Sequence, residues 1–180
     1  MGRIAAVAGG AGDDQLGQHR VVERGTAIEV ADLKEKLLRT LNIHLRVHGQ
    51  PPTALYPANT LLVANHVSWL DIFALNSVTI TRFVAKSEIR RWPLIGTLVT
   101  RAGTLYIERG NRRDAARINQ HMAKAMQDGD CIGLFPEGTT SDGRNLLPFK
   151  ASLFDAAARA GATVQPVTLR FVNADGSVSQ

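Results

Sequence analysis

Residues 60–71 read Thr60-Leu61-Leu62-Val63-Ala64-Asn65-His66-Val67-Ser68-Trp69-Leu70-Asp71. The first five residues form a short, mostly apolar run, which is typical of an inner strand covered on both faces. The last four have the Ser-x-x-Asp form that opens a helix. We therefore expect His66 in a strand-to-helix turn, at the sheet edge where α/β proteins bind their ligands, and Asp71 in the first helical turn.

This placement gives His66 and Asp71 a possible chemical role. A carboxylate in the first helical turn can reach back to an imidazole on the turn before it. Such a pair fixes one tautomer, leaves the other ring nitrogen free as a base and stabilises the imidazolium that forms. The spacing alone is weak evidence, because five histidines and sixteen acids produce it by chance. The alternative is that Asp71 is a helix-capping acid and His66 an ordinary turn residue.

A second motif follows the apolar run Cys131-Ile132-Gly133-Leu134-Phe135 and reads Phe135-Pro136-Glu137-Gly138-Thr139. Proline fixes φ, and glycine permits a tight turn with close backbone approach. We expect the Glu137 carboxylate at the same sheet edge as His66, in a position to hold a polar ligand. An ordinary turn is the alternative. Cys131 is the one cysteine of the chain, and its apolar surroundings predict a buried structural thiol rather than a nucleophile.

The rest of the chain alternates strands with helices, which predicts an α/β fold with a mainly parallel or mixed central sheet flanked by helices. We expect a flexible leader at residues 1–25 and one domain at 26–180. The expected strands are 43–48, 60–64, 80–85, 103–107, 131–135 and 164–172. The expected helices are 28–41, 111–127 and 151–160, the last ended by Gly161.

The net charge of +5 is concentrated in residues 82–117, where nine Lys and Arg stand against three acids. Such a segment attracts phosphate on a nucleic acid, a membrane or a soluble ligand. Nucleic-acid binding is disfavoured, because the segment has few aromatic residues and no reader motif. The sequence has no transmembrane helix and no apolar signal-peptide core. The histidines lack ligand spacing with other metal-binding residues, so no metal is expected.

Two parts of the basic segment suggest binding sites. Arg109 ends a predicted strand just before a helix, and an arginine beside a helix N-terminus makes an anion site, although a solvated arginine is an equal alternative. The run Arg90-Arg91-Trp92-Pro93-Leu94-Ile95 joins cations to apolar side chains. This combination suits an anionic bilayer surface. A partly buried helix with a basic edge is the alternative for that run.

Four blocks in order give the chain a resemblance to the glycerolipid acyltransferases, the group of bacterial 1-acylglycerol-3-phosphate acyltransferases. The blocks are Asn65-His66 with Asp71, Gly103 to Arg109, Phe135 to Thr139, and Gln165-Pro166-Val167. Phe83-Val84-Ala85-Lys86 and Pro93-Leu94-Ile95-Gly96 also look like the family. The resemblance covers the chain from about Lys34 to Val172. It implies an enzyme in phospholipid biosynthesis that moves a fatty acyl group to the hydroxyl of a lysophospholipid.

The resemblance also implies the roles of individual residues. His66 would be the base and Asp71 its orienting partner. Arg109, with Lys86 as a second candidate, would bind the anionic headgroup of the acceptor, and Glu137, Gly138 and Thr139 would shape the acceptor pocket. The donor would be acyl-CoA or acyl carrier protein, with no cofactor, no metal and no acyl-enzyme. Attachment to the cytoplasmic side of an anionic membrane would be peripheral.

The chain departs from the family at two points. Thr140 stands where the third block often has an arginine, and Arg144 or Lys150 could supply the missing charge. The variant Phe-Pro-Glu-Gly-Thr-Thr-Ser-Asp-Gly also resembles enzymes that acylate lyso-ornithine lipid, which is the alternative acceptor. The chain stops soon after the fourth block, so we expect its C-terminal part to be missing. A truncated, non-catalytic lipid-binding remnant is a further alternative.

Overall fold

The central sheet has seven strands in the order β2-β1-β7-β3-β6-β4-β5. In the computed structural model, the described residues are 3–8, 36–49, 58–79, 81–93, 96–97, 100, 103–107, 112–173, 175 and 177. Strands β7 (Thr163–Val172), β3 (Thr60–Ala64), β6 (Cys131–Leu134), β4 (Arg82–Lys86) and β5 (Leu105–Ile107) are mutually parallel. Strand β1 (Arg3–Ala8) is antiparallel to β7 and parallel to β2 (His44–Gly49). The predicted mainly parallel α/β sheet is confirmed.

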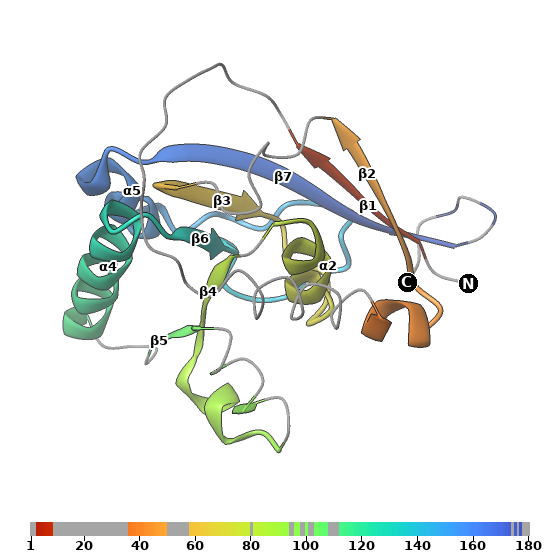
Figure 1. The fold of residues 1–180 in the computed structure, drawn as a ribbon, viewed down its shortest axis with the longest axis horizontal. Helices are drawn as coiled ribbons and strands as arrows, with labels where there is room; N and C mark the ends of the chain where they lie inside the picture. Colours follow the sequence, from red (N-terminus) through yellow and green to blue (C-terminus); the bar gives the residue numbers. More distant parts are fainter. Residues whose placement is uncertain are drawn as a thin grey trace.

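Strand β3 lies at the centre of the fold, and all five of its residues are buried. Leu62 and Ala64 pack in one cluster with α2 (Asp71–Val78). Leu61 and Val63 face the opposite cluster, with α4 (Arg112–Gln127) and α5 (Asp155–Ala160). Figure 1 shows these helices around the sheet, with α2 beside the end of β3 and α4 next to α5. The sheet is therefore covered on both faces at β3, as its apolar sequence predicts.

The register brings the ends of β3 and β6 together beside the middle of β7. Val63 of β3 is the pairing partner of both Leu134 of β6 and Pro166 of β7. Because these strands are parallel, the segments that follow β3 and β6 leave the sheet at the same edge. His66 comes two residues after the end of β3, and Glu137 three residues after the end of β6, so the fold places both turns side by side.

The leader prediction is wrong for residues 3–8, which form β1 between β2 and β7. Its sequence, Arg-Ile-Ala-Ala-Val-Ala, is rich in alanine and lacks the polar–apolar alternation that marks a half-covered strand. The other predicted strands are confirmed to within a few residues. The predicted helix 111–127 is confirmed as α4, whereas 151–160 begins with a 3₁₀ turn, η2 (Ala151–Phe154), before α5.

Some expectations fall partly on residues outside the described ones. Of the predicted helix 28–41, residues 36–40 are described and helical.

Gly161 follows α5 with φ of 60°, the left-handed conformation expected of a glycine at a helix end. In the described part of the chain, no helix has both the length and the apolar character needed to cross a membrane.

Gly133 of β6 makes room for an aromatic ring on the neighbouring strand. A Cβ built on Gly133 would lie 2.4 Å from Cε1 of Phe83 and 2.7 Å from Cγ2 of Thr81. Phe83 is buried and stacks on Phe135, with ring centroids 5.4 Å apart. Glycine at this position therefore lets Phe83 pack directly over the backbone of β6.

We predict that Gly133→Ala lowers the free energy of unfolding by about 1–3 kcal/mol, because the added methyl group overpacks a filled core. Urea denaturation followed by circular dichroism measures the change. The control is Ala158→Ser at an exposed position of α5, which should stay within about 0.5 kcal/mol of the wild type. A Gly133→Ala protein as stable as the wild type would show that Phe83 does not need the space.

Candidate active site

The turn after β3 is organised by one buried carboxylate. Oδ2 of Asp71 lies 2.8 Å from Nδ1 of His66 and accepts the backbone N–H groups of Val67 and Ser68 at 2.7 and 3.0 Å. The Asp71 side chain has no exposed surface. Its position in the first turn of α2 adds the favourable field of the helix N-terminus. The predicted pairing of His66 with Asp71 is therefore present in the structure.

The Asp71 carboxylate also determines the tautomer of His66. An ionised carboxylate accepts hydrogen bonds but donates none, so the hydrogen between the two groups belongs to Nδ1. Nε2 of the neutral ring is then the basic nitrogen. No described residue forms a hydrogen bond with Nε2, and the imidazole is 18% exposed. His66 is thus held with one ring nitrogen bound to protein and the other available to a ligand.

The Ser-x-x-Asp helix signal is realised in part. The Asp71 carboxylate accepts the Ser68 N–H, as in a capping box, while Oγ of Ser68 accepts the N–H of Leu70 at 3.3 Å. The N-cap of α2 is Leu70, which has no side-chain cap. Asp71 therefore holds the backbone of the turn before α2 and is also the partner of His66. The structural and the chemical interpretation of this motif do not exclude each other.

Glu137 connects the two turns. Its Oε1 accepts the backbone N–H of His66 at 2.7 Å, and its Oε2 accepts the N–H of Leu147 at 2.9 Å. Glu137 is 4% exposed. Both carboxylate oxygens thus hold backbone, one in the histidine turn and one in the loop that follows Thr139. The expected contact of Glu137 with an acceptor stays a prediction, whereas its effect on the His66 backbone follows from the geometry.

Two further contacts fix the histidine from other directions. The imidazole stacks on the ring of Phe135, with centroids 4.1 Å apart and planes 14° from parallel. The backbone carbonyl of His66 accepts the N–H of Ser141 at 2.8 Å. Neither contact could be predicted from the sequence, since both depend on how two turns that are distant along the chain meet.

Asn65 joins the end of β3 to β7. Its Nδ2 donates to the carbonyl of Leu169 at 3.0 Å, and its Oδ1 accepts the Leu169 N–H at 2.7 Å. The side-chain amide thereby replaces the backbone pairing that β3 gives up where the chain turns towards α2. Asn65 was recognised as part of the first block, but nothing in the sequence pointed to this partner.

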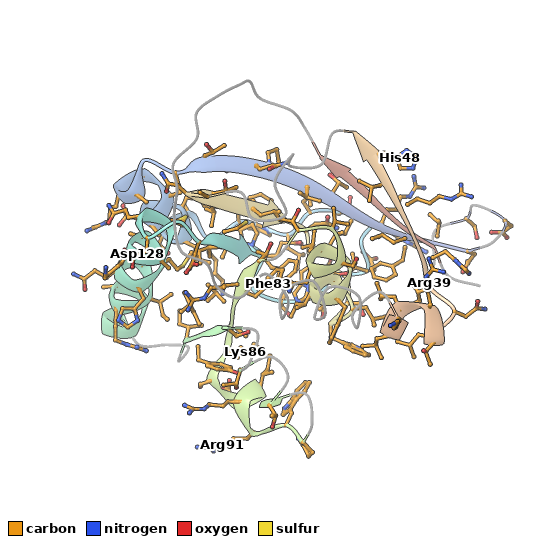
Figure 2. The ribbon with its side chains drawn as sticks, viewed as in Figure 1. Arg39, His48, Phe83, Lys86, Arg91 and Asp128 are labelled. Atoms are coloured by element: carbon orange, nitrogen blue, oxygen red, sulfur yellow. The ribbon has the colours of Figure 1, made fainter. Side chains whose placement is uncertain are left out.

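The remaining predicted site residues lie in different situations. Gly138 adopts φ of 70° in the turn after Glu137, and Thr139 is exposed there. Lys86 ends β4, where Figure 2 labels it. Among the described residues, no hydrogen bond or ion pair joins it to His66. Arg109 lies outside the described residues, so its anion site stays a prediction. Among the residues that the structure describes, no group of three His, Cys, Asp or Glu is arranged to hold a metal ion.

Cys131 is a buried thiol with a raised pKa. Burial raises the pKa of the thiol to about 11, although a hydrogen bond with Thr81 lowers it. The Cys131 side chain is 1% exposed and lies within β6. A thiol that stays protonated at neutral pH and is shielded from solvent is a poor nucleophile. The prediction of a structural cysteine is confirmed.

These features define a class: an α/β protein with an Asp-oriented histidine at the carboxyl edge of parallel strands. A family model described as Acyltransferase matches residues 44–170. The chain belongs to this acyltransferase family.

Several known proteins are similar to the chain. A 1-acyl-sn-glycerol-3-phosphate acyltransferase of Neisseria meningitidis is 45% identical over 147 residues, which are 82% of this chain and 57% of that protein. A lyso-ornithine lipid O-acyltransferase of Pseudomonas aeruginosa is 39% identical over 83% of this chain and 59% of its own length. The chain thus spans somewhat over half the length of these curated relatives.

A solved structure supports the fold. The crystal structure of the 1-acyl-sn-glycerophosphate acyltransferase PlsC from Thermotoga maritima matches with a TM-score of 0.63 at 20% identity. The match covers 86% of this chain and 71% of that one. The two chains therefore share the arrangement of a mostly parallel sheet with flanking helices.

We predict that Glu137→Gln lowers the free energy of unfolding by about 1–3 kcal/mol, because an amide has one acceptor oxygen and leaves one of two backbone N–H groups unpaired. Thermal and urea denaturation measure the loss. Glu88→Gln, at an exposed position, is the matched control and should change little. Equal stability of the two variants would show that Glu137 does not hold the two turns together.

Proposed function

We propose that this protein transfers a fatty acyl group from a thioester to the hydroxyl of a lysophospholipid, with His66 as the general base. The observation that carries the proposal is the contact between Nδ1 of His66 and the buried Asp71 carboxylate. Membership of the acyltransferase family and the similarity to proteins named as lysophospholipid acyltransferases support it. The acyl donor is acyl-CoA or acyl carrier protein, and no cofactor or metal takes part.

The chemistry proposed for His66 is proton transfer. Nε2 takes the proton of the acceptor hydroxyl while the oxygen attacks the thioester carbonyl. Asp71 stabilises the imidazolium through Nδ1–H, as its fixed contact allows. The tetrahedral intermediate collapses with cleavage of the C–S bond, and the imidazolium returns the proton to the leaving thiolate. The products are an ester and a free thiol, and no acyl group is attached to the protein.

The acceptor in this proposal is 1-acylglycerol-3-phosphate. Lyso-ornithine lipid is the second candidate, because a lyso-ornithine lipid O-acyltransferase is 39% identical and because the turn after Glu137 continues with the neutral Thr139 and Thr140. Arg109 and Lys86 are the proposed headgroup cations. Gly138 and Thr139 would line the acceptor pocket.

We also propose peripheral attachment to an anionic membrane through a basic arm, defined as described residues 86–93. Arg90, Arg91 and Trp92 are exposed there, Trp92 by 51%. Figure 2 shows Arg91 at the far end of the arm, well away from the sheet. Cations beside an exposed indole suit the interface between lipid headgroups and acyl chains. The amphiphilic acceptor and product provide the reason for such attachment.

We predict that the purified protein transfers a radiolabelled acyl group from acyl-CoA to 1-acylglycerol-3-phosphate, and that His66→Ala lowers the rate by at least about 100-fold. Asp71→Asn should have a comparable effect, because an amide does not stabilise an imidazolium as a carboxylate does. Thin-layer chromatography of the labelled lipid measures both rates. A parallel assay with lyso-ornithine lipid decides between the two acceptors.

His121→Ala, at an exposed position of α4, is the control for the loss of a histidine and should keep full activity. If the wild type and His66→Ala transfer the label at the same rate, the proposed base is wrong. If a folded wild type transfers none to either acceptor, the proposed acyl transfer to these acceptors is wrong.

We predict that replacing Arg90 and Arg91 together with Gln weakens binding to vesicles that contain phosphatidylglycerol by roughly 10- to 30-fold, at about 1 kcal/mol for each charge. Vesicle co-sedimentation measures the change. Replacing Lys124 and Arg159, exposed on the helices α4 and α5, is the control. Equal binding by both double variants, or equal binding of the wild type to vesicles of neutral lipid, would contradict the proposed surface.

A further inference from the structure

The ring of Phe135 covers one face of the His66 imidazole. The two rings are stacked, with centroids 4.1 Å apart and planes 14° from parallel. Carbon atoms in contact lie about 3.5–4.0 Å apart, so no water molecule fits between rings at this separation. The side chain of Phe135 is itself buried. The stacked face of the imidazole is therefore closed to solvent.

A second aromatic ring packs against Phe135. Phe83, labelled on β4 in Figure 2, stacks on Phe135 with centroids 5.4 Å apart and planes 10° from parallel. Phe83 is buried in the same core cluster and rests on the backbone of Gly133. The Phe135 ring is thus packed against the core by one aromatic contact and against the imidazole by another.

The imidazole meets negative potential at its edge and at its face. At the edge, Nδ1 lies 2.8 Å from the buried carboxylate of Asp71. At the face, the electron-rich side of the Phe135 ring is negative, because the quadrupole of a phenyl ring places its negative lobes there. Glu137 contacts His66 at the backbone N–H and leaves the imidazole face to Phe135.

The strength of the stack depends on the charge of the imidazole. In the proposed reaction, the neutral ring gains a proton at Nε2 and becomes a cation. A cation over an aromatic face is attracted by the ring quadrupole, most strongly where water is excluded. A neutral imidazole gains only the packing. The contact therefore favours the charged state that forms during proton transfer over the neutral state that precedes it.

We propose that Phe135 is a positioning residue that speeds acyl transfer by stabilising the imidazolium of His66 through its π face, while Phe83 holds Phe135 against the imidazole. This inference rests on the proposed proton transfer to His66. Phe135 acts through His66 and needs no contact with either substrate. It should therefore affect kcat and leave KM unchanged.

The test replaces Phe135 by mono-, di- and trifluorinated phenylalanine, introduced by amber suppression. Fluorine withdraws electrons from the face of the ring and barely changes its shape, so the packing is kept while the attraction for a cation falls. We expect kcat to fall stepwise, reaching roughly 3- to 30-fold below the wild type with three fluorines, at constant KM. A kcat that stays the same across the series overturns the inference.

Natural amino acids separate this effect from loss of packing. Phe135→Leu, which removes the π face, should lower kcat at least as much as three fluorines do. Phe171→Leu is the matched control, because Phe171 packs against the same core cluster and has no ring contact with His66. It should keep full kcat. Adding Phe83→Leu to Phe135→Leu should lower kcat no further, because Phe83 acts through Phe135. An additional loss would contradict the role of Phe83.

A second measurement does not depend on turnover. Nuclear magnetic resonance of the His66 ring protons over a pH series gives the pH at which the imidazole gains its second proton. This pH should fall by roughly 0.5–1 unit from the wild type to the trifluorinated protein, because the cation loses its π partner. Asp71 and Glu137, which bind His66, are the same throughout. An unchanged titration overturns the inference, whereas equal activity of the wild type and His66→Ala overturns the proposed acyl transfer.

Discussion

The structure of the site depends on a single buried oxygen, Oδ2 of Asp71, which binds three hydrogen-bond donors. Removing a carboxylate from water is costly unless its lone pairs are satisfied. Two backbone N–H groups and one imidazole N–H satisfy Oδ2, and the start of α2 adds a favourable field. The other oxygen, Oδ1, is buried without a hydrogen-bond partner among the described residues, so Oδ2 carries the stabilisation. The same contacts close the turn and orient the ring. The hydrogen bonds that fold the turn are therefore the same ones that orient the imidazole.

Glu137 extends this arrangement from one turn to two. It is a second buried carboxylate whose oxygens accept backbone N–H groups. Its Oε1 accepts the N–H of His66, which lies 71 positions earlier in the chain. The stacked rings of Phe83, Phe135 and His66 form a column behind the turn. Because Phe83 rests on Gly133, this column is continuous with the core of the sheet. The imidazole is thus held by hydrogen bonds at its polar edge and by packing on its face.

Features that depend on residues close together in the chain could be predicted from the sequence. Features that depend on contacts between distant segments could not. The apolar runs of β3 and β6 gave nearly correct bounds, because a strand covered on both faces leaves a local composition signal. His66 and Asp71 could be paired from five residues of spacing and a helix-start motif. Strand β1 could not be recognised, since its alanine-rich sequence becomes a strand through pairing with β2 and β7.

The partners of Glu137 and Asn65 were also beyond sequence analysis. Both side chains lie in motifs that were recognised, yet what they bind is set by the order of strands in the sheet. Glu137 meets the His66 backbone because β3 and β6 are neighbours, and Asn65 meets Leu169 because β7 is the other neighbour of β3. A spacing rule within one segment contains no information on such contacts. The same applies to Lys150. Its charge was noted from the sequence, but the position of its Nζ against the Gly138 turn could not be predicted.

The two hydrogen bonds between Asn65 and Leu169 have a consequence for folding during translation. These residues are 104 positions apart. At a translation rate of about 5–20 residues per second, roughly 5–20 seconds pass between the synthesis of Asn65 and that of Leu169. During that interval β3 has no β7 beside it, and one of its edges is open to any other extended chain. The nascent protein thus holds a buried, apolar strand with an open edge until β7 is made, and a chaperone that covers this edge would prevent wrong pairing.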